Sequence, residues 1–491
     1  MSEKDYNFDK QMIEQLSYVT PPEEEVRKTN PWSKPIGFIT WGFILTTMHL
    51  NFLYLQYILP VIGVILIFLG FRSLRNENKY FKVAWLLSIL KLSLHLGDLV
   101  WISTPLNIMD YPKFAIGSVM FPFQIALFLV FRAALKETSK KADRLMESEP
   151  LLWATLWTMA SYLIALSPLS NSWLIFIPML VCYIFIVRSL YSIGDELDDT
   201  GYVLTNAPVK ISNQTFGWTY FLIAFTVVII CSIFSNHLKL QSQEYFHPET
   251  IEARQHLLDL EFPAEALRYL SNEDVTMLSE AVNVESFSKL LMIDAKRIEH
   301  QESYGNSTQI THTYEPGKKN IQAATVYIEM PKNIMYVMQY FKWNGGRPIW
   351  QDGILISGET AADDKQIISS GLFYSKRDAE YTADFPRIVC DKVTQHTMFG
   401  TYYPVLITGA LSYPLGSEDQ GGYVLYRYTV KADSDIYDTY NIFSYVHLLS
   451  PLHIPYARTE DLILSGAYTF EDMLQQHQTK YESLASISKE R

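Results

Sequence analysis

Residues 37–71 read GFITWGFILTTMHLNFLYLQYILPVIGVILIFLGF, 35 consecutive positions without Asp, Glu, Lys or Arg. A helix rises about 1.5 Å per residue, so a bilayer core of about 30 Å needs about 20 apolar residues. One helix of this length would extend for about 50 Å, which is too long for one span. We therefore expect two short spans, over about 37–53 and 57–71, with a break in the region 51–56 and at Pro60. A single long helix is the alternative.

Five further apolar segments follow the first pair. They cover about 82–101, 114–131, 151–167, 172–189 and 217–234. Trp and Tyr side chains flank these segments, as expected at the depth of lipid headgroups. The sequence therefore predicts an α-helical transmembrane bundle of about seven spans over residues 37–236, with the lipid bilayer as its first partner.

The Lys and Arg residues of this half are unevenly distributed. The N-terminal tail and three alternate loops hold 16 of them, whereas the other loops hold only Lys113. The positive-inside rule places the tail, residues 1–36, in the cytoplasm. Seven spans then place the chain from about residue 237 on the extracytoplasmic side of a cell membrane. The tail is polar and begins with no early apolar core, so we expect no cleavable signal peptide.

The two halves of the chain differ in charge. Residues 1–240 contain 19 Lys and Arg and 18 Asp and Glu, whereas residues 241–491 contain 21 and 34, a net charge of −13. This acidity excludes a nucleic-acid binder that relies on bulk positive charge. It also disfavours anionic polymers as ligands of the second half and allows cations or basic peptides.

Short helices are expected directly after the last span, in a helical collar over residues 237–287. Pro263 occupies a plausible first helical position. Ser271 followed by Glu273 and Asp274 predicts the start of another helix.

From residue 288 to 465 the pattern changes to short β-branched and aromatic runs separated by turn residues. These runs are 321–330, 334–343, 354–358, 367–374, 402–411, 423–430 and 442–449. They predict a mainly-β domain of the sandwich or jelly-roll type. Asn344-Gly345-Gly346 predicts a hairpin turn. A last helix is expected over about 469–485, within a C-terminal helix and tail of residues 466–491.

Two stretches carry a family resemblance. They are GFRSLRNENK, residues 70–79, and LLDLEFPAEALRYL, residues 257–270, which precedes the strand-rich part. Together they resemble a group of uncharacterised multi-pass membrane proteins of Clostridia-type Gram-positive bacteria. The resemblance implies a membrane bundle with a β domain in a bacterial cell membrane, and it implies no activity.

One predicted span carries a polar stripe. Its members are Ser88, Lys91, His95 and Asp98. Spacings of 3, 4 and 3 place them within an arc of about 80° on one helix face. Charge at mid-membrane is costly and normally has a partner inside the bundle, so the stripe is a candidate ion, proton or polar-ligand site. A polar network that only packs helices is the other interpretation.

The second half offers weaker candidates. Trp343 and Trp350 flank the Asn-Gly-Gly turn and could stack on a ligand, although core packing is the default use of such side chains. Asp433, Asp435 and Asp438 are weak calcium candidates, because they lack the Gly and the distal Glu of an EF-hand loop. Eight histidines are spread without the spacing of metal ligands. They are His247, His256, His300, His312, His396, His447, His453 and His477.

The sequence contains no G-x-S-x-G, H-E-x-x-H, Walker, G-x-G-x-x-G or C-x-x-C motif. We therefore expect no cofactor. The favoured hypothesis is a non-enzymatic membrane protein whose extracytoplasmic β domain serves surface recognition, sensing or assembly with a cell-surface or protein partner. The alternatives are a transporter or channel-like protein that uses the stripe of the third span, and a membrane-embedded enzyme acting on lipid or peptide. Oligomeric state stays open.

Overall fold

A computed structural model defines the chain in two units. Contacts within the chain group residues 1–102 with 109–228, and residues 103–108 with 229–491. The structure describes residues 32–47, 50, 53–109, 113–142, 149–167, 172–199, 204, 207–246, 251–293, 296–304, 307–315, 318–345, 348, 350–358, 364–397, 400–430, 438–448, 452, 454–465 and 472–482.

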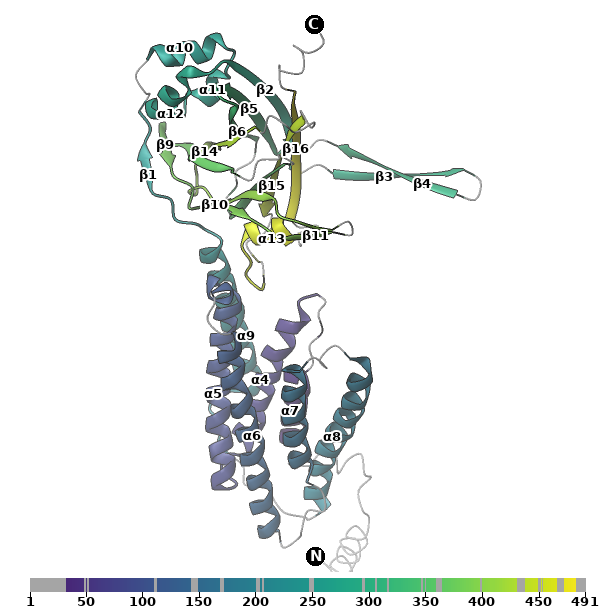
Figure 1. Ribbon diagram of the computed structural model, residues 1–491. Helices are drawn as coiled ribbons and strands as arrows, with labels where there is room; N and C mark the ends of the chain where they lie inside the picture. Colours follow the sequence, from purple (N-terminus) through teal and green to yellow (C-terminus); the bar gives the residue numbers. More distant parts are fainter. Residues whose placement is uncertain are drawn as a thin grey trace, which may run out of the picture. The chain divides into compact units, whose positions relative to one another are not determined.

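The first unit is helical (Figure 1). Its helices are α3 (Ser33–Thr47), α4 (Leu55–Leu74), α5 (Lys79–Ile102), α6 (Lys113–Lys141), α7 (Pro150–Ala165), α8 (Trp173–Asp199) and residues 213–228 of α9 (Asn213–Ser235). Each helix overlaps one of the apolar segments predicted from the sequence. The predicted division of the chain into a helical first half and a β-rich second half is therefore confirmed.

Four helices of the described chain are long and apolar enough to cross a membrane. They are Leu55–Leu74, Lys79–Ile102, Trp173–Leu197 and Asn213–Ser235. The sequence predicts seven spans, and the structure supports these four. Helices α3 and α7 have 15 and 16 residues, fewer than the roughly 20 that a straight span needs.

The long apolar run of residues 37–71 forms two helices. Helix α3 ends at Thr47, and Leu53 and Tyr54 adopt left-handed φ angles of 49° and 58° immediately before α4. The break therefore precedes Pro60, which lies inside α4. The two helices pack closely, because a Cβ atom on Gly42 would lie 2.7 Å from the carbonyl oxygen of Gly63. Such small-residue contacts are typical of helix pairs in membranes.

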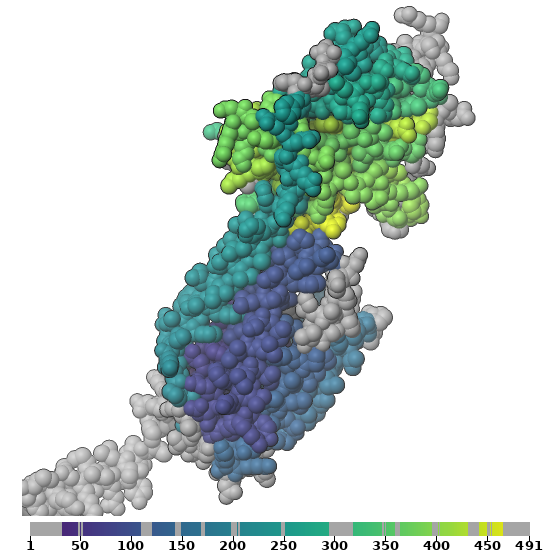
Figure 2. Space-filling model, turned by 90° about the vertical axis from the view of Figure 1, so that its left-hand side faces the viewer, coloured from purple at the N-terminus to yellow at the C-terminus, as the bar shows by residue number. Residues whose placement is uncertain are grey.

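Helix α9 packs beside α4 and α5 in this unit, as both views show (Figures 1 and 2). The rings of Phe68 and Phe216 stack with their centroids 4.4 Å apart. The Tyr220 hydroxyl donates a 2.9 Å hydrogen bond to the backbone oxygen of Leu92. The last helix of the bundle is thus fixed against its second and third helices.

The second unit contains two larger antiparallel sheets. The seven-stranded sheet has the order β1-β9-β8-β14-β6-β5-β2, and the five-stranded sheet has the order β10-β13-β7-β15-β16. The strands of the first are β1 (Ser242–Glu244), β2 (Asn283–Met292), β5 (Asn320–Met330), β6 (Ile334–Gly345), β8 (Gln366–Lys376), β9 (Ala379–Ala383) and β14 (Glu418–Thr429). Those of the second are β7 (Asp352–Ser357), β10 (Arg387–Lys392), β13 (Val405–Leu411), β15 (Asp438–Leu448) and β16 (Asp472–Glu482).

The two sheets share one hydrophobic core. Phe341 of β6 stacks on Phe443 of β15 with ring centroids 5.9 Å apart. Val424 from the first sheet and Ile356 from the second are fully buried in the same cluster. Met335, Val337, Phe341 and Trp343 of β6 all belong to this core, as the two-residue period of a strand requires.

The collar covers the other face of the seven-stranded sheet. It consists of α10 (Glu252–Asp259), α11 (Ala264–Leu267), α12 (Asn272–Met277) and the 3₁₀ turn η3 (Leu278–Glu280). Leu257 and Val275 pack with Ile328 and Met338 of the sheet. Both faces of β5 and β6 are therefore largely buried, which explains why apolar residues point to both faces of these strands. The collar adjoins the strands in one continuous surface (Figure 2).

Ser271 begins α12 with a capping box, in which its hydroxyl accepts from the backbone N–H of Asp274 at 3.0 Å. This confirms the predicted helix start. The collar nevertheless ends earlier than predicted, because β2 already begins at Asn283.

Two local predictions are wrong. No hairpin joins β6 to β7 across Asn344–Gly346, because β6 and β7 lie in different sheets. The helix expected over 469–485 is replaced by β16, which pairs antiparallel with β15 from Asp472 to Glu482. The Leu, Gln, Lys and Glu residues of this segment favour a helix, and the open edge of β15 overrides that preference.

Between β2 and β5 along the chain, two further strands, β3 (Lys296–Tyr304) and β4 (Ser307–Glu315), pair with each other, and we call this pair the arm. Strand β3 pairs antiparallel with β4 along nine residue pairs. The pair is a sheet of its own and joins neither larger sheet. It extends outward from the β domain in Figure 1. A further short pair, β11 (Gln395–Thr397) and β12 (Gly400–Tyr402), forms another two-stranded sheet.

Candidate functional site

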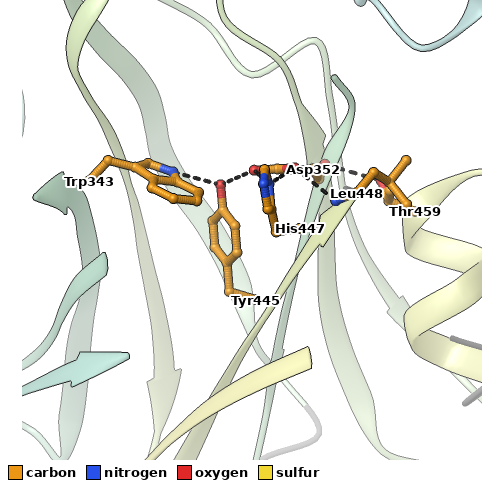
Figure 3. Close-up of polar contacts among 6 residues, drawn as sticks. All are labelled: Trp343, Asp352, Tyr445, His447, Leu448 and Thr459. Atoms are coloured by element: carbon orange, nitrogen blue, oxygen red, sulfur yellow. Dashed lines mark hydrogen bonds and ion pairs between the residues drawn. The ribbon is translucent and has the colours of Figure 1, made fainter. Parts of the chain in front are cut away.

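A buried carboxylate lies between the two large sheets. Asp352, the first residue of β7, has no exposed surface. Its Oδ2 accepts a 2.6 Å hydrogen bond from the Tyr445 hydroxyl, and its Oδ1 lies 2.9 Å from Nδ1 of His447. The backbone N–H of Leu448 donates to Oδ1 at 3.3 Å. Figure 3 shows these groups converging on the carboxylate, and we call Trp343, Asp352, Tyr445 and His447 the polar centre.

Strand geometry brings the polar centre together. Tyr445 and His447 are two residues apart on β15 and therefore point to the same face. Strand β7 pairs with β15 so that Gly353 faces Val446, which places Asp352 next to His447. Trp343 comes from β6 in the opposite sheet, and its Nε1–H donates to the Tyr445 hydroxyl at 3.1 Å. The polar centre thus links the two sheets.

A second set of contacts attaches the helix α13 (Thr459–Ser465) to the back of β7. The Thr459 hydroxyl donates to the backbone oxygen of Asp352 at 3.1 Å. The side-chain amide of Gln351 contacts Thr459 at 3.0 Å and the Tyr456 hydroxyl at 3.1 Å. Gly353 is required by this approach, because a Cβ atom there would lie 2.8 Å from Cβ of Thr459. The position of the Asp352 backbone is therefore fixed from both sides of the sheet.

An ion pair also connects α13 to the five-stranded sheet. Nε of Arg387 lies 3.1 Å from Oε1 of Glu460 on α13. Burial raises the pKa of Glu460, and the charge of Arg387 opposes that rise. The pair joins α13 to β10, the edge strand of the five-stranded sheet.

The polar centre is closed to solvent, and this limits the chemistry that it can perform. Burial, reinforced by the Asp352 carboxylate, raises the pKa of Tyr445 well above its usual range, so its hydroxyl stays a donor. Asp352, Tyr445 and His447 are at most 4 % exposed. A carboxylate beside Nδ1 of a histidine supplies two of the three members of a catalytic triad. Among the described residues, no hydroxyl or thiol donates to Nε2 of His447, so the structure supplies no nucleophile for such a triad.

A second polar network crosses the same core. Thr325 donates to Oε1 of Gln339 at 2.8 Å, and Asn441 donates to the same oxygen at 3.2 Å. The Tyr426 hydroxyl donates to Oδ1 of Asn441 at 3.2 Å. Two satisfied networks between the sheets fix their relative register, because a shifted strand would leave buried polar groups without partners.

The predicted stripe lies on one helix, α5. Ser88 is fully buried and donates to the backbone oxygen of Trp85 at 2.7 Å. Nζ of Lys91 donates to Oε1 of Gln124 on α6. His95 is 9 % exposed, and Asp98 is half-buried. The structure therefore joins Lys91 to a neighbouring helix and gives no contact between Lys91 and Asp98.

Trp343 and Trp350, which flank the Asn-Gly-Gly sequence, lie in different surroundings. Trp343 is 5 % exposed in the polar centre, where its ring also meets that of His447 with centroids 5.1 Å apart. Trp350 is half-buried and lies just before β7. Because β6 and β7 belong to different sheets, the two rings do not form one hairpin face.

The calcium candidates fall mostly outside the described residues. Asp433 and Asp435 lie there, and of Asp438 the structure describes only its backbone, at the start of β15. Within the described part of the chain, no group of three or more His, Cys, Asp or Glu side chains is arranged to hold a metal ion.

Sequence reasoning did not single out Asp352. His447 appeared only as one of eight scattered histidines. A usable signal exists, because each is a polar residue inside or beside a strongly apolar strand, in DGILIS and in IFSYVHLL. Strand periodicity places His447 on the same face as Phe443 and Tyr445.

Comparisons with known proteins give no family for the chain. No family model matches it, and no curated protein matches it. Several solved structures, among them the following three, show weak similarity. One, described as "AvmM Catalyzes Macrocyclization in Alchivemycin A Biosynthesis", has 14 % identity and a TM-score of 0.19 over 38 % of this chain and 96 % of that chain. One on adhesion of Streptococcus parasanguinis by Fap1 fimbriae has 6 % identity and a TM-score of 0.14 over 33 % and 74 %.

The third is a heparinase III, the BT4657 gene product, with 8 % identity and a TM-score of 0.14 over 98 % of this chain and 77 % of that chain. TM-scores of this size carry no argument about function. The function has to be inferred from the geometry of the chain itself.

Proposed function

We propose that the chain is a non-enzymatic integral membrane protein whose C-terminal β domain, sandwich-like and extracytoplasmic, serves recognition and assembly at the cell surface. The helical bundle anchors it with seven spans, of which α3 and α7 are short, and the N-terminal tail lies in the cytoplasm. Four long apolar helices support the membrane anchor. The concentration of Lys and Arg in alternate loops supports the orientation.

The arm formed by β3 and β4 is the observation that carries the proposal. Its backbone pairs are internal, from Lys296 opposite Glu315 to Tyr304 opposite Ser307. An isolated two-stranded hairpin is at best marginally stable in water. Each strand also has an outer edge that pairs with no other described strand. A long hairpin held outside the core is therefore suited to binding a strand edge of another protein by β-addition.

The closed polar centre supports a non-enzymatic role. A catalytic site needs an open position next to its reacting groups. The groups with the most reactive arrangement, Asp352 and His447, are 0 % and 4 % exposed and lie inside the shared core. Both groups lie in the five-stranded sheet, and the Tyr445 hydroxyl that donates to Asp352 connects them to Trp343 of the other sheet. This link would keep the domain rigid while the arm engages a partner.

Removal of the arm tests whether the β domain folds without it, as the proposal requires. Met292 faces Asn320 in the β2–β5 register, and the N–H of Ile293 donates to the Lys319 oxygen at 3.0 Å. Residues 294–318 can thus be replaced by Asn-Gly, which closes β2 and β5 with a two-residue hairpin turn. The armless chain should fold with an unchanged melting temperature in detergent.

A photo-reactive amino acid at Gln301 of β3 then reports the partner in native membranes. We expect one discrete cross-linked protein at this position and none with the same residue at the exposed Gln366 on β8. An adduct of twice the chain mass would identify a second copy, and another mass a different protein. Equal labelling at both positions, or no adduct at Gln301, would contradict the proposal.

A further inference from the structure

Lys91, a half-buried cation of the helical bundle, has no acidic partner in the described part of the chain. Lys91 lies in the middle of α5 and donates to the neutral Gln124 oxygen. Among the described residues, no Asp or Glu lies within ion-pair distance of its Nζ. Asp98, the acidic residue of the same stripe, is seven positions along α5, roughly 10 Å along the helix axis. A charge at this depth of a membrane requires a partner of opposite sign.

Two enclosed side-chain nitrogens beside Lys91 lack hydrogen-bond partners within the part of the chain that the structure describes. Nε2 of Gln124 is fully enclosed and has no hydrogen-bond partner among the described residues. Nε2 of His95 is in the same state, in a side chain that is 9 % exposed. His95 follows Lys91 by four residues, so the two side chains are neighbours on one helix face. Buried polar groups without partners are uncommon and cost stability, so two of them beside a cation that lacks an acidic partner indicate a missing ligand.

The neighbouring polar groups do not fill this need. The Ser88 hydroxyl is committed to the backbone oxygen of Trp85. The Tyr220 hydroxyl is committed to the Leu92 oxygen. What remains is an excess of N–H donors and one positive charge, which matches an anion and repels a cation.

We propose that Lys91, Gln124 and His95 form a binding site for a small inorganic anion inside the helical bundle. The anion accepts hydrogen bonds from the ammonium group of Lys91 and from the side-chain N–H of Gln124. His95 contributes its Nε2–H, which assigns the tautomer with the proton on that nitrogen. The site belongs wholly to the first unit, so it is independent of the function proposed for the β domain.

Thermal unfolding of the full chain in detergent tests this site, with chloride as the probe. Sodium chloride replaces sodium gluconate from 0 to about 0.5 M at constant ionic strength, because a ligand that binds the folded state raises the melting temperature. We expect the wild type to gain about 3 °C or more. Lys91→Gln should show no gain. Lys82→Gln, at an exposed position of the same helix, should respond like the wild type.

A second variant keeps the test decisive if Lys91→Gln does not fold. Gln124→Glu has nearly the same shape and places a carboxylate where Lys91 already donates. The built-in anion should remove the chloride dependence and give, in gluconate, a melting temperature at least equal to that of the wild type in chloride. A wild type that is insensitive to chloride, or a Gln124→Glu chain that responds as the wild type does, would overturn the proposal.

Discussion

The Tyr445 hydroxyl and the Asp352 carboxylate form a 2.6 Å hydrogen bond in the fully buried core between two sheets. The carboxylate also accepts from the backbone of Leu448 and contacts Nδ1 of His447. Three donors thus surround one buried anion, which is the arrangement that makes a buried charge tolerable. The stability of the β domain should therefore depend on this carboxylate.

Asp352→Asn tests that dependence. The amide keeps the size of the side chain but places an NH₂ group against one of the donors that now face the carboxylate. We expect the free energy of unfolding to fall by about 3 kcal/mol, as for a broken buried pair. Chemical denaturation of the full chain in detergent measures it. Asp391→Asn, at an exposed position of β10, should change stability by less than about 0.5 kcal/mol. Equal effects of the two substitutions would contradict the prediction.

The contact between Trp343 and Tyr445 can be isolated by a double-mutant cycle. Trp343→Phe removes the indole N–H that donates to the Tyr445 hydroxyl, and Tyr445→Phe removes the hydroxyl. Because each removes the same hydrogen bond, the double variant should lose less stability than the two single losses together. We expect a coupling of about 1 kcal/mol. Strictly additive losses would mean that the bond does not tie the sheets together.

Gly353→Ala should displace α13 from the five-stranded sheet. The new methyl group would lie 2.8 Å from Cβ of Thr459 and 3.0 Å from Cδ1 of Ile463. We expect a loss of about 2 kcal/mol, typical of overpacking, and faster hydrogen exchange in α13. Gly97→Ala, where no atom lies within 4 Å of the new methyl group, is the matched control and should not lose stability. Unchanged exchange in α13 would show that the helix is not held by this contact.

Lys365 gives a pH dependence with a definite sign. Its Nζ donates to the Val405 oxygen at 3.3 Å, and burial lowers the pKa of Lys365 to about 8. An unfolded chain keeps the ordinary lysine pKa of about 10.4, so between about pH 8 and pH 10.4 it binds more protons than the folded chain. Folding stability contributed by this group therefore rises with pH over that interval.

Lys365→Met should lack this rise. Burial raises the pKa of the neighbouring Cys390 thiol, which titrates in the same interval with the opposite sign. Both proteins keep Cys390, so the prediction concerns their difference. The stability advantage of Lys365→Met at pH 7 should shrink by pH 10, as measured by thermal unfolding at several pH values. A constant difference would mean that Lys365 titrates normally.

Local patterns predicted the elements well where burial and sequence agree. The apolar segments located the bundle helices, and Ser271 located the start of α12 through its capping box. The alternating β-branched runs located most strands of the two sheets. In each of these cases the signal lies within a few consecutive residues.

Features that depend on distant pairing were not predictable from local sequence. Asn344–Gly346 has the composition of a hairpin turn, yet β7 pairs with β13 and β15. The segment 472–482 favours a helix by propensity, and the free edge of β15 makes it a strand. The polar centre was missed for the same reason, because Asp352 and His447 are 95 positions apart and meet only through that pairing.

Labelling of intact cells with a membrane-impermeant thiol reagent is the most direct test of the central claim. That claim is that the β domain lies outside a bilayer that the helical bundle spans. Cys182, Cys231 and Cys390 are replaced by Ser, and a single cysteine is introduced as Leu415→Cys, a position that is 70 % exposed in the β domain. A second chain carries Lys140→Cys at the basic end of α6. The account predicts that Leu415→Cys is labelled on intact cells and Lys140→Cys only after permeabilisation. The reverse pattern would contradict it.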